Sequence, residues 1–335
     1  MNLHLRRTLL LLPLLSLLFL TLGAANLSAQ SLDYNYLFVS TRAAGTTEDG
    51  LAYEPGDIIG AQGLGGAWFM AFDASDNGLT ANQNVNAFDL TVPELNGNAA
   101  AVPGAIYLTF SQPRVRVPGV PGWVTSSDAV VFEEAQNGNA PEDNYEMFFD
   151  GSDVGLTTRS EQIDSLSLWE TGPFAPNAVA LPSDCTAGML FISTAANYRV
   201  PAAEGGALTG RGGDVLAFCA TNLGPDTAGF WFKAFDAQAA GFAPLRALRN
   251  VSVNDVGAMS PEGDWELTFS FSSHTDFNAG SFHGDANVVY LYETTGGVVG
   301  PVVDLNVDYP VLNGVADGLV IDRYVPQCNS VGPNC

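Results

Sequence analysis

Hydrophobic and polar residues alternate along short stretches of this chain, and Gly, Pro, Asn and Asp fill the gaps between those stretches. In the run 68–72, Trp68, Met70 and Phe72 would lie on one face of an extended strand, and the run 145–149 has the same pattern. After the N-terminal segment, no run keeps a 3.6-residue apolar period with helix caps. The pattern predicts an all-β protein.

The predicted strands fall into four types, a to d, that recur in the same order. Strand b ends in Ser, strand c begins with Asp or Asn, strand d is rich in aromatic residues, and strand a follows d. The runs are 85–88, 163–166, 253–256 and 316–319 for a; 37–40, 108–111, 190–193 and 267–270 for b; 57–59, 128–132, 214–218 and 287–291 for c; and 68–72, 145–149, 231–235 and 303–307 for d.

A short phrase marks the end of each strand d. Residues 72–79 read Phe-Asp-Ala-Ser-Asp-Asn-Gly-Leu, and residues 149–156 read Phe-Asp-Gly-Ser-Asp-Val-Gly-Leu. Weaker copies lie at 235–242 and 307–312. A repeat this long, filled with short strands, is typical of stacked or radially arranged β units.

The order of the strands predicts how the ends of the chain meet. The chain after the leader begins with b, c and d, and it ends with an unpaired strand a at 316–321. If that last strand completes the first sheet, the exposed sheet edges disappear. We therefore predict a four-bladed β-propeller over residues 30–326, closed by the N- and C-terminal strands. Two β-sandwich domains, divided near 170–185 where prolines cluster, are the alternative.

The phrase at 149–156 and its flanking strands resemble repeats of exported bacterial proteins that are largely uncharacterised. The resemblance extends over nearly the whole chain after the leader, and the copies at 235–242 and 307–312 depart from it most. It implies secretion and repeated β structure. It implies no activity, and it transfers no catalytic residues.

The N-terminus and the cysteines also indicate export. Arg6 and Arg7 precede an apolar run, and small residues near Ala29 suit cleavage, so residues 1–29 are predicted to be a signal peptide. No later segment is long and apolar enough to span a membrane. We expect the protein outside the cell or in the periplasm. The four cysteines suit two disulfides there, Cys185–Cys219 across neighbouring strands and Cys328–Cys335 closing the tail 327–335.

Charge restricts the partners of the protein. There are 36 acidic residues against 12 Lys and Arg, and the net charge is −24. Such an anionic surface disfavours nucleic acids and anionic lipids, whose phosphates require cationic neighbours. It suits cations and basic partners, and it keeps a protein soluble as a monomer.

Two sets of acidic or amide side chains are candidate sites. Asp73 with Asp76, and Asp150 with Asp153, provide hard oxygen ligands on a tight loop, as Ca²⁺ requires. The preferred interpretation is an Asx turn, because the third copy of the phrase lacks the second Asp. No cofactor is expected to be required.

The second set is at one position of strand a: Asn86, Asp164, Asn254 and Asp317. These residues could line a central channel and hold a cation or water, or bond the backbone of the neighbouring sheet, which we prefer. The residues at the entry of strand c are predicted to accept hydrogen bonds from nearby amides. They are Asp57, Asp128, Asp214 and Asn287.

The remaining signals suggest binding more than catalysis. His274 and His283 lack a recognised metal spacing, and Trp123 lies in a loop, where it can stack on a sugar or a partner. The b–c connections are long, and such loops commonly carry binding surfaces. We expect a secreted, non-catalytic protein that binds a protein or glycan through these loops. A glycan-active hydrolase with carboxylates near a channel, and a structural envelope component, are the alternatives.

Overall fold

The computed structural model describes residues 36–62, 66–80, 83–90, 105–133, 145–169, 184–241, 248–255, 265–271, 275–277, 282–284, 288–293, 297–304 and 316–322. From residue 248 onward only the backbone is described. The chain divides into two compact units, Met1–Gln30 and Ser31–Cys335, and all described residues belong to the second.

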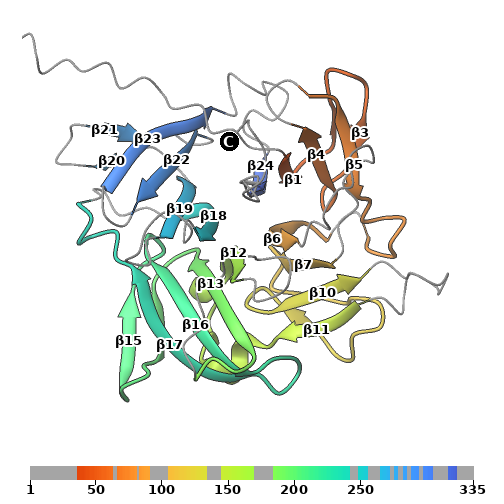
Figure 1. Ribbon diagram of the computed structural model, residues 1–335. Helices are drawn as coiled ribbons and strands as arrows, with labels where there is room; N and C mark the ends of the chain where they lie inside the picture. Colours follow the sequence, from red (N-terminus) through yellow and green to blue (C-terminus); the bar gives the residue numbers. More distant parts are fainter. Residues whose placement is uncertain are drawn as a thin grey trace, which may run out of the picture. The chain divides into compact units, whose positions relative to one another are not determined.

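The described strands form four antiparallel sheets of four strands each (Figure 1). Their orders are β24-β1-β4-β5, β6-β7-β10-β11, β12-β13-β16-β17 and β18-β19-β22-β23, and we call them the first to fourth sheets. The first sheet contains Ala316–Asp322 (β24), Tyr36–Thr41 (β1), Ile58–Gln62 (β4) and Trp68–Phe72 (β5). The second contains Val85–Leu90 (β6), Ala105–Phe110 (β7), Ala129–Glu133 (β10) and Tyr145–Phe149 (β11). The third contains Ile163–Trp169 (β12), Gly188–Thr194 (β13), Val215–Asn222 (β16) and Ala228–Phe235 (β17). The fourth contains Leu248–Asp255 (β18), Trp265–Phe271 (β19), Val288–Glu293 (β22) and Gly297–Asp304 (β23).

This order confirms the predicted a-b-c-d sequence of strands in each sheet. Strands β5 and β11 have the predicted bounds, and β24 pairs with β1, with Leu37 opposite Ile321. The last strand d was predicted at 303–307, and this bound is wrong because β23 occupies Gly297–Asp304. The Gly-Val-Val-Gly-Pro stretch lacks alternation, which hides the start of this strand from a periodicity analysis.

Each b–c connection contains a small two-stranded hairpin that the apolar pattern did not predict. Strands of two to four residues are too short to show a period of two. The hairpins are Gly45–Thr46 (β2) with Ala52–Tyr53 (β3), Arg114–Val115 (β8) with Val124–Thr125 (β9), Tyr198–Pro201 (β14) with Ala207–Gly210 (β15), and Thr275–Phe277 (β20) with Phe282–Gly284 (β21). Two short 3₁₀ helices, Gly151–Val154 (η2) and Arg159–Glu161 (η3), connect β11 to β12.

The buried apolar side chains pack between neighbouring sheets. One cluster joins the first and second sheets through residues such as Phe38, Phe72 and Phe132, and another joins the second and third sheets around Phe149 and Trp231. The Phe72 and Phe132 rings meet edge to face at 5.1 Å between centroids. Aromatic side chains fill the space between the faces of neighbouring sheets, which explains why they are concentrated in strand d.

A hydrogen bond recurs at both of these sheet boundaries. The hydroxyl of Tyr145 donates to the carbonyl of Asn77 (2.9 Å), and the indole Nε1 of Trp231 donates to the carbonyl of Val154 (2.9 Å). In each pair the aromatic residue occupies the same position of strand d, and the acceptor lies in the phrase that ends strand d of the preceding sheet. The polar atom of a buried aromatic residue is satisfied, and adjacent sheets are held in register.

The first strands of the four sheets also contact one another. Strand β12 contacts β6 and β18, and β24 contacts β6 and β18. The residues Ser31–Cys335 belong to one compact unit.

The predicted Cys185–Cys219 disulfide is present, and it joins the loop before β13 to β16. Cys328 and Cys335 lie outside the described residues. Among the residues that the structure describes, there is no helix of the length and hydrophobicity needed to cross a bilayer.

Candidate functional site

One aspartate at the entry of strand c has the same contacts in three sheets. We call Asp57, Asp128 and Asp214 the corner aspartates. Each is buried, and its two carboxylate oxygens accept backbone N–H groups from two different turns. The donors are Glu54 (2.7 Å) and Ala74 (2.9 Å) for Asp57, Thr125 (2.7 Å) and Gly151 (3.0 Å) for Asp128, and Arg211 (3.2 Å) and Ala237 (3.1 Å) for Asp214.

These contacts confirm the predicted role of the residue at the entry of strand c. A register shift follows each corner aspartate at the same place, for example between Ala129 and Val130 of β10. The carboxylate therefore links the end of the b–c hairpin to the turn after strand d, and it satisfies one backbone donor in each. The fourth member of the predicted set, Asn287, lies outside the described residues.

Burial opposes the charge of these carboxylates. Desolvation raises the pKa of Asp57, and it raises the pKa of Asp128 from 3.8 to about 6, although the N–H donors act in the opposite direction. The nearby carboxylate of Asp150 raises the pKa of Asp128 further. The second sheet thus contains a buried carboxylate that titrates close to neutral pH.

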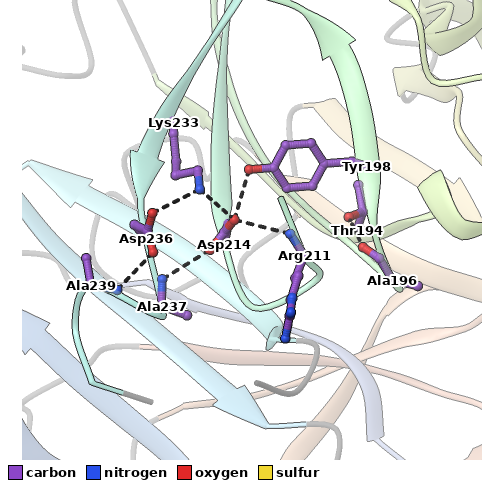
Figure 2. Close-up of polar contacts among 9 residues, drawn as sticks. All are labelled: Thr194, Ala196, Tyr198, Arg211, Asp214, Lys233, Asp236, Ala237 and Ala239. Atoms are coloured by element: carbon purple, nitrogen blue, oxygen red, sulfur yellow. Dashed lines mark hydrogen bonds and ion pairs between the residues drawn. The ribbon is translucent and has the colours of Figure 1, made fainter. Parts of the chain in front are cut away.

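The third sheet surrounds its corner aspartate with two more donors (Figure 2). The Nζ of Lys233 lies 3.0 Å from Oδ2 of Asp214 and 2.9 Å from Oδ2 of Asp236, and the hydroxyl of Tyr198 donates to Oδ2 of Asp214 at 2.9 Å. Lys233 is the only lysine in the chain. The equivalent residues of the first and second sheets are Met70 and Met147, which pair with Ile59 and Val130 as Lys233 pairs with Leu216.

The electrostatics of this cluster indicate an ion bridge and not a nucleophile. Burial alone would lower the pKa of Lys233, but the hydrogen bonds and charges of Asp236 and Asp214 outweigh it and raise the pKa above 10.5. The N–H of Ala239 and then Lys233 lower the pKa of Asp236. At neutral pH the ammonium group is therefore charged and engaged, whereas a catalytic lysine requires a lowered pKa.

The Asx turns after strand d are formed by the first aspartate of the phrase. Oδ1 of Asp73 accepts the N–H of Asp76 (3.0 Å), and Oδ1 of Asp150 accepts the N–H of Ser152 (3.0 Å). Asp76 and Asp153 are exposed. Among the described residues, no three His, Cys, Asp or Glu side chains gather as a metal site would require. The turn role is confirmed, and calcium binding stays the alternative.

Two polar residues of strand a, Asn86 and Asp164, meet at the boundary between the second and third sheets. The Nδ2 of Asn86 donates to the carbonyl of Ile163 (2.6 Å) and lies 3.5 Å from Oδ1 of Asp164. Both residues are buried, and each occupies the position that the strand register skips. Asp317 also occupies a skipped position, whereas Asn254 pairs with Glu266. The predicted equivalence is therefore wrong for Asn254, because the register of β18 shifts earlier, between Arg249 and Ser252.

The second b–c hairpin presents the predicted Trp123. We call residues 114–125 the tryptophan loop. Its valines are buried in the core between the first and second sheets, while Trp123 is 47% exposed. The guanidinium carbons of Arg114 and Arg116 lie 4.9 and 4.2 Å from the centroid of the Trp123 ring. Both distances are in the range of a cation–π contact.

No protein-family model matches this chain, and no curated protein matches it.

Three candidate residues for binding a partner or glycan have described side chains: Asn86, Asp164 and Trp123. Asn86 and Asp164 are buried, whereas Trp123 is exposed on a loop. The two arginines beside this ring were not predicted from the sequence. The signal that could have found them is alternation, since Arg114 and Arg116 are exposed on either side of the buried Val115. His274 lies outside the described residues, and His283 is in β21, where only the backbone is described.

Proposed function

We propose that this chain is an exported binding protein that contacts a glycan or protein partner through the b–c loops of a closed four-bladed propeller. The observation that supports this function best is the tryptophan loop. It places an exposed aromatic side chain and two cationic side chains on a hairpin whose valines are anchored in the core. Side chains held on a rigid scaffold lose little entropy when they bind, so they suit recognition.

The strand pairing supports the closed arrangement. Strand β24 supplies the a strand of the first sheet, and contacts run from β6 to β12, β18, β24 and back to β6. A sheet completed in this way has no free β1 edge to pair with other molecules. The disulfide and the apolar N-terminal segment support export, since disulfides persist in oxidising compartments.

The function is tested by shortening one loop at a time. A two-residue Asn-Gly turn would replace residues 116–123 of the second b–c loop, and residues 202–206 of the third would be replaced in a matched variant. Both variants would be applied to a panel of immobilised glycans and secreted proteins. We expect at least one interaction of the intact protein to be lost in one loop variant and retained in the other. Two folded variants that keep every interaction would contradict the proposal.

The same panel separates binding from hydrolysis. Released sugar ends would be measured after incubation of each glycan with the intact protein and with Asp164→Asn. We expect no cleavage by either. Cleavage by the intact protein that Asp164→Asn abolishes would favour the hydrolase alternative.

A further inference from the structure

The tryptophan loop reverses the charge of an otherwise acidic chain. No Asp or Glu occurs between Glu94 and Asp128, although the chain has 36 acidic residues. Asp128 is buried, and its oxygens accept the N–H groups of Thr125 and Gly151. The corresponding loop of the first sheet contains Glu48, Asp49 and Glu54. The second b–c loop is therefore locally cationic, while the first is anionic.

The two cations of this loop are available to a ligand. Arg114 and Arg116 are both exposed, and neither pairs with a carboxylate among the described residues. Their guanidinium carbons lie 4.9 and 4.2 Å from the centroid of the exposed Trp123 ring. Guanidinium groups are planar forks that bind carboxylate and sulfate oxygens with two parallel hydrogen bonds.

The loop is held in shape by contacts on its inner side. Val115, Val117 and Val120 are buried, and the Nε2 of Gln83 donates to the carbonyl of Arg116 (2.6 Å). The Nη1 of Arg116 donates to the carbonyl of Gly122, which has a positive φ of 91°. The backbone and one guanidinium group are thus fixed before any ligand arrives, which lowers the entropy lost on binding.

We infer that the tryptophan loop binds an acidic polysaccharide, a chain of sugar rings that carry carboxylate or sulfate groups. The guanidinium groups of Arg114 and Arg116 bind the anionic groups, and the indole of Trp123 packs against the apolar face of a sugar ring. This inference deepens the proposed function, and it rests on it.

Two other anionic partners fit the loop less well. A double-stranded nucleic acid carries one negative charge per about 1.7 Å of its axis. The net charge of −24 therefore repels it more strongly than a single chain of acidic sugars, whose charges are spread over successive rings. An acidic peptide supplies carboxylates but no apolar ring face for Trp123. It would also find strands β8 and β9 of only two residues each, too short to be extended by a peptide strand.

The test measures binding of the purified protein to four polymers at low and at physiological ionic strength. Polygalacturonate carries carboxylates on sugar rings, dextran sulfate carries sulfates, dextran is neutral, and polyglutamate has carboxylates without rings. We expect one or both acidic polysaccharides to bind at least roughly tenfold more tightly than dextran and polyglutamate, and the tighter of the two identifies the anionic group. Binding should weaken as salt rises.

Variants assign the binding to the loop. Arg114→Gln/Arg116→Gln should weaken acidic polysaccharide binding by roughly tenfold or more, and Trp123→Ala by several-fold. Arg199→Gln is the matched control, because Arg199 is exposed on β14, the corresponding hairpin of the third sheet. It should leave binding unchanged. Circular dichroism spectra and melting temperatures would show that all three variants are folded.

Three results would overturn the inference. The first is that polyglutamate binds as tightly as polygalacturonate and that Trp123→Ala does not change its binding. The second is that the Arg199→Gln control weakens polysaccharide binding as much as the arginine variant of the tryptophan loop does. The third is that neither acidic polysaccharide binds. The last result, together with a loop-dependent interaction in the glycan and protein panel, would leave the proposed function standing. Loss of that loop dependence would overturn the proposed function itself.

Discussion

The second and third sheets each contain a corner aspartate, but the two aspartates have different contacts. Asp128 and Asp214 both accept two backbone N–H groups at the entry of strand c. Only Asp214 also receives an ammonium group and a phenol, from Lys233 and Tyr198. The third sheet is in addition cross-linked by a disulfide, whereas the second presents the tryptophan loop.

This difference separates the contacts that form the corner from the additional contacts that strengthen it in the third sheet. The corner forms without an ammonium group or a phenol, because the second sheet forms it with the N–H groups of Thr125 and Gly151 and the side chain of Thr125. These contacts are not enough to keep the carboxylate fully ionised, since the pKa of Asp128 rises to about 6. Reinforcement is therefore concentrated in the third sheet.

The largest expected effect comes from the disulfide of the third sheet. Cys185→Ala/Cys219→Ala frees a segment with a sequence separation of 34 residues and should lower the free energy of unfolding by roughly 2–4 kcal/mol. This change is measured by chemical denaturation, with tryptophan fluorescence as the signal of unfolding. As a control, a non-reducing digest of the wild-type protein should yield a pair of peptides linked through Cys185 and Cys219. A double variant that is as stable as the wild type would show that the disulfide does not reinforce this sheet.

The second prediction concerns acid and the corner of the second sheet. Folding raises the pKa of Asp128 above 3.8, so this carboxyl group binds its proton more tightly in the folded state than in the unfolded state. Its contribution to stability is present below pH 4 and is lost as the pH rises to about 6. The change corresponds to roughly 3 kcal/mol. Unfolding curves from pH 4 to 7 should show this dependence in the wild type and not in Asp128→Asn.

The third sheet supplies a contrast of the opposite sign. The pKa of Asp236 is lowered, so its contribution is present above pH 4 and is lost as the pH falls further. Asp236→Asn should remove a dependence that lies below the Asp128 window. If the Asp128→Asn and wild-type stabilities remain parallel from pH 4 to 7, the corner carboxylate of the second sheet titrates normally and the comparison fails.

A third prediction exchanges the residue that distinguishes the two corners. Lys233→Met gives the third sheet the residue found in the second, and it leaves Asp214 buried without its cation. We expect a loss of roughly 1–2 kcal/mol at pH 7, less than for a fully buried ion pair because Lys233 is 23% exposed. The loss should shrink below pH 4, where Asp236 takes up its proton and no longer pairs with Lys233. Equal losses at pH 7 and below pH 4 would argue against an electrostatic cause.

The reverse exchange sharpens this test. Met147 pairs with Val130 as Lys233 pairs with Leu216, so Met147→Lys places an ammonium group beside Asp128. It should lower the pKa of Asp128 and flatten the pH dependence between 4 and 6. Met70→Lys in the first sheet is the control, because it alters the same position without approaching Asp128.

The contrast between these corners also shows which features a sequence can predict. The strand order, the corner hydrogen bonds and the Cys185–Cys219 pair follow from local patterns, since each depends on a short motif at the end of a strand. The Lys233 cluster was missed, because it joins side chains from β14, β17 and the turn before β16. Its one visible sign is a lone lysine at a position where two other sheets have methionine.

The candidate site was also predicted only in part, because some of its contacts depend on structure that a short motif does not show. Trp123 could be found from the sequence because it lies in the connection between predicted strands b and c, next to Gly122. That two arginines contact its ring depends on the hairpin of β8 and β9, which is too short to be predicted by periodicity. Asn254 was misplaced because a register shift in β18 leaves no trace in the sequence.

The smallest expected effect concerns the Asx turns, for which the third sheet is again the reference. Oδ1 of Asp236 accepts the N–H of Ala239 (2.9 Å), so the turn forms where the phrase has no second aspartate. Asp153→Ala should therefore change stability by less than about 0.5 kcal/mol, whereas Asp150→Ala should cost about 1 kcal/mol.

Calcium provides the decisive comparison for these turns. A chelator should leave the melting temperature unchanged, and millimolar Ca²⁺ should not raise it. A ligand that binds only the folded state stabilises it in proportion to the logarithm of its concentration, so a rise with added Ca²⁺ that Asp153→Ala removes would establish a metal site. In that case the second aspartate of the phrase would be a ligand, and the third sheet would have lost a site that the first two retain.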